Sequence, residues 1–178
     1  MAIDKSDGVI VFTGNGKGKT TSAVGLAIKS IMKGLSVCYI RFMKPPEYDG
    51  EMRVLSKLIS NPQNLKSFGT KGFIAKGKAR PHDFVWAKQG LSYAFERMIS
   101  AEIDTLVLDE LHNALYFNLL SWQEVEKFLR QKPSSVALIT TGRNAPEELV
   151  QIADWVVEFA EVKHPYVTGI GSRKGIEH

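Results

Sequence analysis

The run G-N-G-K-G-K-T-T at residues 14–21 is the stretch whose residues most clearly point to chemistry. It follows an apolar run, Val9 to Phe12, and precedes a segment with apolar residues at helical spacing. Backbone amides of a glycine-rich loop between a strand and a helix bind phosphate oxygens, and the helix N-terminus adds partial positive charge. The residues expected to bind the phosphates of a nucleotide are Gly14, Asn15, Gly16, Lys17, Gly18, Lys19, Thr20 and Thr21.

This loop departs from the general phosphate-loop pattern G-x-x-x-x-G-K-[ST] at its first position, where Thr13 replaces glycine. Lys19 is nevertheless placed to reach the terminal phosphates, and the hydroxyl of Thr20 is placed to bind Mg²⁺. A plain glycine-rich turn is the alternative interpretation. Gly-Lys-Thr-Thr at the junction of a strand and a helix favours the phosphate site over that turn.

Two acidic residues, Asp109 and Glu110, end a second apolar run. A carboxylate at the end of a neighbouring strand can bind the metal of a nucleotide, although acids at this position are often structural. Together with the Lys19 loop, they favour a metal site. Because adjacent strand residues face opposite sides of a sheet, we expect only one acid to contact the metal directly. Arg143 follows another apolar run, where it either meets phosphates or is a plain surface residue.

Residues that other nucleotide-dependent reactions require are missing from these motifs. The guanine-reading motif N-K-x-D is not in the sequence, and Leu111 and His112, rather than a water-orienting glutamine, follow the acids. His112 and His164 have no evident partner, so a structural role is expected for each. The basic segment of residues 71–80 has no interleaved aromatic ladder and indicates a solvated loop rather than a nucleic-acid surface.

Strand-like and helix-like runs alternate along the chain. Apolar strands separated by helices imply an α/β fold whose mostly parallel sheet is covered on both faces. Residues 61–81 and the tail at 163–178 are expected to be irregular, and residues 1–7 to be flexible. Strands are expected at 9–12, 36–42, 104–110, 135–141 and 154–160, and helices from about 19, at 51–60, 83–100 and 121–131, with a short one at 146.

Length and composition predict a single soluble domain spanning residues 1–178. Apolar residues make up 44% of the chain and charged residues 24%, and the net charge of +4 suits small polyanionic ligands. Cys38 is the only cysteine, which excludes a disulfide framework and favours a reducing compartment. The first eight residues, MAIDKSDG, lack the apolar core of a signal peptide, and no apolar run of about 18 residues is present. A cytoplasmic location is therefore expected.

Taken together, the motifs resemble the P-loop type of ATP:corrinoid (cob(I)alamin or cob(I)yrinic acid a,c-diamide) adenosyltransferases. The G-N-G-K-G-K-T-T loop and the Val-Lys-His tail are the most specific features. The matching stretches, in chain order, are FTGNGKGKTT (12–21), GE (50–51), LVLDEL (106–111), ITTGRNAP (139–146), IADWVVE (152–158) and VKHPYVTGIGSRKGIEH (162–178).

The resemblance implies transfer of the 5′-deoxyadenosyl group of ATP to the Co(I) of a reduced corrinoid, with release of triphosphate. It implies that Lys19 neutralises the departing triphosphate, and that Thr20 and Glu110, with Asp109 beside them, hold Mg²⁺. It also implies a three-layer, RecA-like P-loop fold, a homodimer, a flavoprotein reductant as partner, and a place in adenosylcobalamin biosynthesis or salvage. No nucleic-acid or membrane partner is expected.

One segment departs from the family pattern. The family has a Gly-Phe-Thr-Trp run whose aromatics help to displace the lower ligand of the corrinoid, and here residues 72–75 read Gly-Phe-Ile-Ala. Phe73 keeps the implied catalytic role, Ala75 stands in place of the tryptophan, and Trp86 is a candidate substitute. The departure leaves open a nucleotide-gated corrinoid carrier without transferase activity. A generic P-loop ATPase is the third interpretation.

Overall fold

The computed structural model describes residues 8–47, 50–72, 74 and 77–163. The expected flexible start at residues 1–7, Phe73, Ala75, His164 and nearly all of the expected irregular tail lie outside the described residues.

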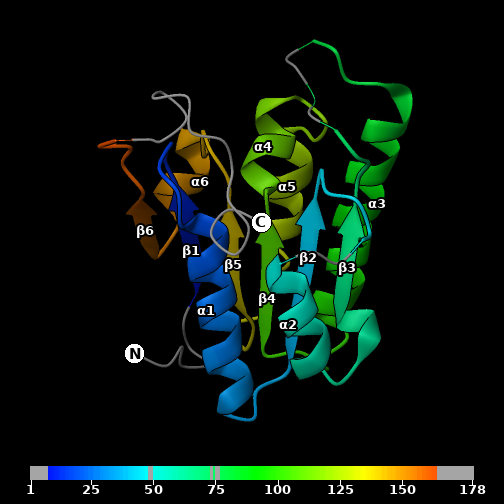
Figure 1. Cartoon of the computed structure of the whole chain (residues 1–178), viewed down its shortest axis with the longest axis vertical. Coiled ribbons are helices and arrows are strands. Elements are labelled where there is room, and N and C mark those ends of the chain that lie inside the picture. Colours follow the sequence, from blue (N-terminus) through cyan, green and yellow to red (C-terminus); the bar gives the residue numbers. More distant parts are fainter. Residues whose placement is uncertain (1–7, 48–49, 73, 75–76, 164–178) are drawn as a thin grey trace.

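Six strands form the central sheet, in the order β3-β2-β4-β5-β1-β6 (Figure 1). All of the registered pairings between them are parallel. This arrangement confirms the predicted α/β class with a mostly parallel sheet. The strands are β1 (Val9–Thr13), β2 (Val37–Phe42), β3 (Leu65–Phe68), β4 (Thr105–Asp109), β5 (Ala137–Thr141) and β6 (Trp155–Glu158).

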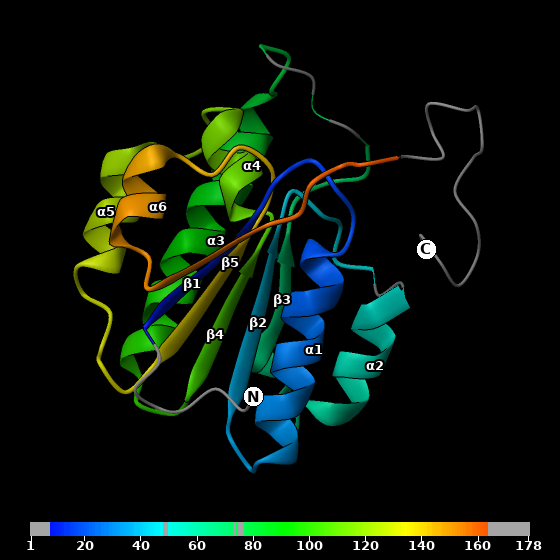
Figure 2. The ribbon, with the colours of Figure 1, turned by 90° about the vertical axis from the view of Figure 1, so that its left-hand side faces the viewer.

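Helices cover both faces of this sheet and make three layers (Figure 2). One face carries α1 (Lys19–Met32) and α2 (Gly50–Leu58). The other face carries α3 (Pro81–Ile99), α4 (Leu111–Tyr116), α5 (Trp122–Leu129) and α6 (Glu147–Ile152). Among the described residues, no helix combines the length and the apolarity that crossing a membrane requires.

Alternate residues of the central strands enter two separate cores, which is why these strands are apolar throughout. Ile40 and Leu108 pack into the core under α3, whereas Tyr39 and Val107 pack into the core under α1. All four side chains are fully buried. Burying a large apolar side chain contributes about 1.5–3 kcal/mol to the free energy of folding. Both faces of the central strands therefore stabilise the sheet.

Two short elements differ from the sequence prediction. Residues 61–81 were expected to be irregular, but β3 pairs with β2 at the edge of the sheet, after a 3₁₀ turn at Pro62–Asn64. Only Leu65 of β3 is fully buried, and a four-residue edge strand with so little apolar character carries no periodic signal. The six-residue α4 was likewise not predicted. Ser121 and Glu124, which read S-x-x-E in the sequence, form a capping box at the start of α5.

Candidate functional site

The carboxyl ends of β1, β4 and β5 bring the predicted site residues to one edge of the sheet. Residues 14–18 connect β1 to α1, Asp109 ends β4, and Arg143 follows β5 by two residues. Ligands of parallel α/β sheets bind at this edge, outside the carboxyl ends of the strands. The topology therefore gathers three motifs that are up to about 130 residues apart in the sequence.

Thr13 does not open the loop, because it is the last residue of β1. It pairs with Glu158 of β6, and its Oγ1 accepts a hydrogen bond from the Ala145 amide at 3.2 Å. A glycine at position 13 would lose this hydroxyl and weaken the strand. At the position where the general pattern has glycine, Thr13 thus extends β1 and holds Ala145 through its hydroxyl.

The glycines of the loop allow the chain segment after β6 to lie directly against it (Figure 2). The Gly16 amide donates to the Phe159 carbonyl oxygen at 2.7 Å. A Cβ atom on Gly16 would lie 2.6 Å from the Ala160 oxygen, and one on Gly14, whose φ is +96°, would lie 2.5 Å from the Phe159 oxygen. Any larger residue at either position would therefore push this segment away.

The Lys19 ammonium lies over the loop from which it projects. Its Nζ donates to the carbonyl oxygens of Gly14 and Gly16, at 2.8 and 2.6 Å. Burial lowers the pKa of Lys19, and the positive charge of Arg143 lowers it further, while the carboxylates of Glu110 and Asp109 oppose both effects. The charges of Arg143, Glu110 and Asp109 therefore all act on the Lys19 ammonium. The side chains of Asn15, Lys17 and Thr21 are exposed.

Asp109 is the acid that meets the loop. Its Oδ1 accepts hydrogen bonds from the hydroxyls of Thr20 at 2.9 Å and of Thr141 at 2.6 Å. The residue is 1% exposed, and burial raises the pKa of its carboxyl group although both hydroxyls lower it. The predicted link between the loop and the β4 acids is therefore direct, and it runs through Thr20.

Glu110 lies just outside β4, where its left-handed backbone (φ +65°) ends the alternation of the strand. Its amide donates to Thr141 Oγ1 at 3.0 Å, and its carboxylate accepts a hydrogen bond from the Asn113 side chain. Asn113 Oδ1 in turn accepts the Arg143 amide at 3.0 Å. Burial and the charge of Asp109 raise the pKa of Glu110, whereas Lys44 and Lys19 lower it. Glu110 lines a cavity beside the loop, whereas Asp109 bonds Thr20.

The oxygen atoms at this edge suit a hard divalent cation. Mg²⁺ prefers carboxylate and hydroxyl oxygens and usually shares them with phosphate oxygens and water. Thr20, Asp109 and Glu110 offer such atoms, and burial of both carboxyl groups favours a nearby positive charge. Within the described residues, no group of three or more histidine, cysteine, aspartate or glutamate side chains could hold a metal ion without further ligands. The donors therefore fit a magnesium ion that arrives with a nucleotide.

A cavity of about 690 Å³ opens beside these groups. Asn15 of the loop and the pair Arg143 and Asn144 form one wall. The segment 43–45 after β2 and residues 70–72 and 74 form another wall, and Glu110 with three side chains of the α4 region closes the cavity. The lining combines cationic, polar and apolar groups, and its volume is within the range of roughly 300–1,000 Å³ that small-molecule sites occupy.

His112 is held inside the fold rather than presented to the cavity. It is fully buried, and its two ring nitrogens lie 3.1 Å from the Gly142 carbonyl oxygen and 2.9 Å from Thr140 Oγ1. Burial lowers the pKa of His112 to about 4, so the ring is neutral at neutral pH. This geometry agrees with the structural role expected from the sequence.

Trp86, the candidate substitute for the family tryptophan, does not line the cavity. It lies on α3 and packs against Phe68 with ring centroids 6.3 Å apart. Thr70, Lys71 and Gly72, which precede α3 in the sequence, line the cavity instead.

Sequence reasoning missed three residues that organise the site, namely Lys44, Asn113 and Thr141. Thr141 bonds both acids, Asn113 joins Glu110 to Arg143, and Lys44 adds a cation beside the carboxylates. The only sequence signal for Thr141 is that a polar residue ends the apolar run that forms β5. The other two stand in segments without a periodic pattern.

Comparisons with known proteins agree with the geometry. The model of the family described as ATP:corrinoid adenosyltransferase BtuR/CobO/CobP matches residues 5–178. A corrinoid adenosyltransferase of Sinorhizobium sp is 31% identical over 175 residues, which cover 98% of this chain and 81% of the relative. The corrinoid adenosyltransferase of Escherichia coli (strain K12) is 30% identical over 179 residues, which cover 100% of this chain and 89% of the relative.

A solved structure is similar in fold. The flagellar accessory protein FlaH from Methanocaldococcus jannaschii aligns with a TM-score of 0.53 at 15% identity, over 86% of this chain and 70% of that chain. At this identity the likeness bears on the fold alone. It supports the three-layer P-loop architecture that the sequence predicts.

Proposed function

The chain belongs to the ATP:corrinoid adenosyltransferase family, and from that premise we propose that it transfers the 5′-deoxyadenosyl group of ATP to the cobalt of a reduced corrinoid. The observation that carries the proposal is the bond between Thr20 and Asp109, which joins a phosphate loop to an acid beside a cavity. A water-activating residue is not needed for this reaction. Leu111 is buried, and both ring nitrogens of His112 are engaged, so neither residue after the acids can orient a water molecule.

In the proposed reaction, the electron pair of Co(I) attacks C5′ of the ATP ribose. The new cobalt–carbon bond forms as the bond from C5′ to the phosphate oxygen breaks, and triphosphate leaves with that electron pair. Cobalt ends formally as Co(III), so the corrinoid must arrive already reduced. The protein contributes by positioning the two substrates and by stabilising the charge that develops on the leaving triphosphate.

The loop and two cations would stabilise the leaving group. Lys19 already lies over the loop, and Arg143 is close enough to influence its pKa. Partial burial of Lys19 strengthens its attraction for a phosphate, because less water screens the charge. The start of α1 and the loop amides other than that of Gly16, which bonds Phe159, would add to this field.

Thr20 would bind Mg²⁺ through its hydroxyl, with Asp109 and Glu110 as the neighbouring carboxylates. When bound, the ion neutralises phosphate charge and fixes the geometry of the triphosphate. Thr141 positions Asp109 by donating to its Oδ1, and Asn113 positions Glu110. These contacts hold Glu110 at the edge of the cavity and Asp109 against Thr20.

The corrinoid would occupy the cavity opposite the loop. Tyr116 and Phe117 of the α4 region offer apolar surface to a macrocycle, and Lys44 and Lys71 suit its amide or carboxylate side chains. We carry the catalytic role of Phe73 over from the family resemblance, and its neighbours Gly72 and Ile74 line this cavity.

We further propose cob(I)alamin or cob(I)yrinic acid a,c-diamide as the acceptor, a homodimer as the working form, and a flavoprotein as the electron donor. A cytoplasmic enzyme of adenosylcobalamin biosynthesis or salvage follows from that activity. These finer assignments rest on the family resemblance and on the chemistry that Co(I) requires.

The test is an anaerobic assay with MgATP and chemically reduced corrinoids. We expect the light-sensitive spectrum of an adenosyl-corrinoid, together with triphosphate. Binding of both substrates without that product would favour the carrier, and steady release of phosphate without a corrinoid would favour the ATPase. Either result would contradict the proposal.

A further inference from the structure

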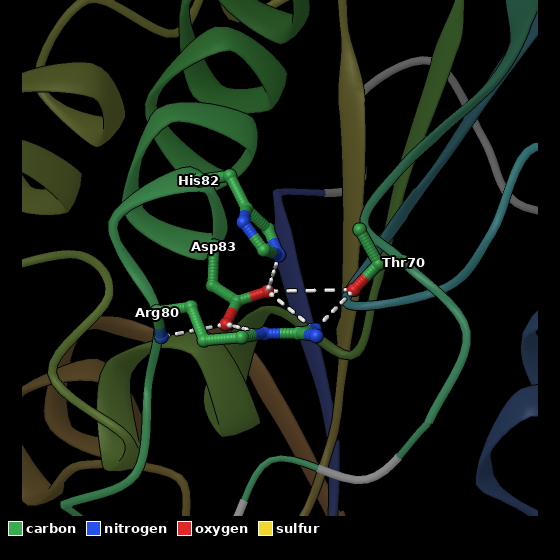
Figure 3. Close-up of polar contacts among 4 residues, drawn as sticks. All are labelled: Thr70, Arg80, His82 and Asp83. Carbon is green, nitrogen blue, oxygen red and sulfur yellow. Dashed lines mark hydrogen bonds and ion pairs between the residues drawn. The ribbon is translucent and has the colours of Figure 1, made fainter.

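Four polar side chains meet where the cavity wall joins the start of α3 (Figure 3). They are Thr70, Arg80, His82 and Asp83, and Asp83 is at their centre. Thr70 stands in the segment that lines the cavity, while Arg80 immediately precedes α3. Residues ten positions apart in the sequence are therefore connected by hydrogen bonds through one carboxylate.

The carboxylate of Asp83 makes contacts with each of the other three residues. Its Oδ2 accepts hydrogen bonds from the backbone amide of Arg80 at 2.8 Å and from Arg80 Nε at 3.3 Å. Its Oδ1 accepts a hydrogen bond from the Thr70 hydroxyl at 3.4 Å. Arg80 Nη2 also donates to Thr70 Oγ1 at 2.8 Å. His82 Nε2 lies 3.5 Å from Oδ1. We call Thr70, Arg80 and Asp83 the clasp.

Asp83 is almost completely buried, at 3% exposure, although it carries a charge. Burial opposes ionisation, but the amide and guanidinium of Arg80 outweigh it and hold the pKa of Asp83 below its ordinary value. A buried carboxylate at the third position of a helix often serves only to cap that helix. Here one of its oxygens also accepts Thr70, which lies outside the helix, so capping alone does not account for its contacts.

The sheet also holds the start of the wall at residues 70–72. The Met43 amide donates to the Phe68 carbonyl oxygen at 2.8 Å, which joins the end of β3 to the segment after β2. Lys71 bonds to Glu47 at 2.9 Å. Thr70, Lys71 and Gly72, which follow β3, line the same cavity as Glu110 and Arg143.

We propose that Asp83 is a positioning residue for the corrinoid, because its carboxylate holds Thr70 and Arg80 together and thereby fixes the cavity wall at residues 70–72. This inference rests on the proposed function for its substrate. It does not make Asp83 a catalytic residue, since Asp83 acts only through Thr70 and the wall. Losing the clasp should weaken corrinoid binding and leave nucleotide binding, at the opposite wall, nearly unchanged.

Two substitutions test the clasp from its two ends. Asp83→Asn removes the charge, and Thr70→Val removes only the hydroxyl, with no change to the start of α3. We expect each to raise the KM for the corrinoid about tenfold, with kcat and the KM for ATP changed less than about twofold. Ser121→Ala is the matched control, because Ser121 caps α5 and does not line the cavity, so its replacement should leave both KM values unchanged.

Hydrogen exchange of peptides covering residues 66–72 provides a readout that needs no turnover. Both variants should exchange faster there than the wild type, and Ser121→Ala should not. If the wild type makes adenosyl-corrinoid while both variants keep its corrinoid KM, the positioning role is wrong and the proposed function stands. If only Asp83→Asn raises that KM, Asp83 is merely a helix cap. If the wild type makes no adenosyl-corrinoid, the proposed function fails. Independently of turnover, unchanged hydrogen exchange at residues 66–72 in Thr70→Val would overturn the clasp.

Discussion

Buried His112 should make the stability of this protein depend on pH in a defined direction. The folded state lowers the pKa of His112 from 6.5 to about 4, mainly because burial excludes the imidazolium ion. The Gly142 carbonyl bond opposes this shift, and the charge of Lys19 adds to it. Between these two values the unfolded chain binds a proton that the folded chain does not, so the free energy of unfolding falls as the pH falls.

The magnitude follows from the shift. Each pKa unit is worth about 1.36 kcal/mol, and between pH 8 and pH 5 the linkage relation gives a loss of about 2 kcal/mol from this one residue. Stability from His112 is fully present above the unfolded pKa and is lost as the pH falls toward about 4. A loss of this size is a large fraction of the 5–15 kcal/mol that typically separates folded from unfolded states.

Urea unfolding at pH 5, 6, 7 and 8 measures this dependence. His112→Gln should unfold with a pH dependence smaller by about 2 kcal/mol over that range, even if its stability at pH 8 is lower. Leu138→Ala is the matched control, because Leu138 is likewise fully buried but carries no titratable group, so its replacement should lower stability by the same amount at every pH. Parallel curves for the wild type and His112→Gln would refute the assignment of a buried, neutral ring.

Three further substitutions address the site. Lys19→Ala should slow adenosyl transfer by an order of magnitude or more in single-turnover experiments, because loop electrostatics contribute several kcal/mol, and near-normal turnover would argue against the phosphate site. Thr20→Val should raise the Mg²⁺ concentration for half-maximal rate by about tenfold, since it removes a proposed ligand that also bonds Asp109, and an unchanged Mg²⁺ titration would remove Thr20 from the metal site. Ala75→Trp should speed the reaction of complete cobalamin if the missing aromatic limits lower-ligand displacement. Equal rates would mean that another residue does this work.

Much of the architecture could be predicted because its signals are local. The strand at Val9 and the strand ending at Asp109 are apolar on both faces, as a parallel sheet between two helical layers requires. Ser121 and Glu124 form a capping box that is visible as S-x-x-E. The glycine-rich loop with Lys19 indicated a phosphate site at a strand-to-helix junction, and the structure places Thr20 against Asp109.

The remaining features depend on contacts between distant segments. Thr13 looks like a defect in a loop pattern, and its role becomes clear only when β6 pairs beside it and Ala145 bonds its hydroxyl. The alternation of side chains along β4 could not predict the direction of the Glu110 side chain, because the left-handed backbone of Glu110 ends the strand. Thr70 belongs to a segment without periodicity, and only the packing of α3 brings Asp83 to it.

The central claim is that carbon, not phosphorus, is transferred. Its most direct test is a single turnover with ATP carrying ¹³C at C5′ and an anaerobically reduced corrinoid, followed by ¹³C and ³¹P NMR. The account predicts a cobalt-bound labelled methylene that disappears on exposure to light, and one intact triphosphate for each methylene formed. Label remaining in ADP or AMP, with orthophosphate or pyrophosphate released, would contradict it.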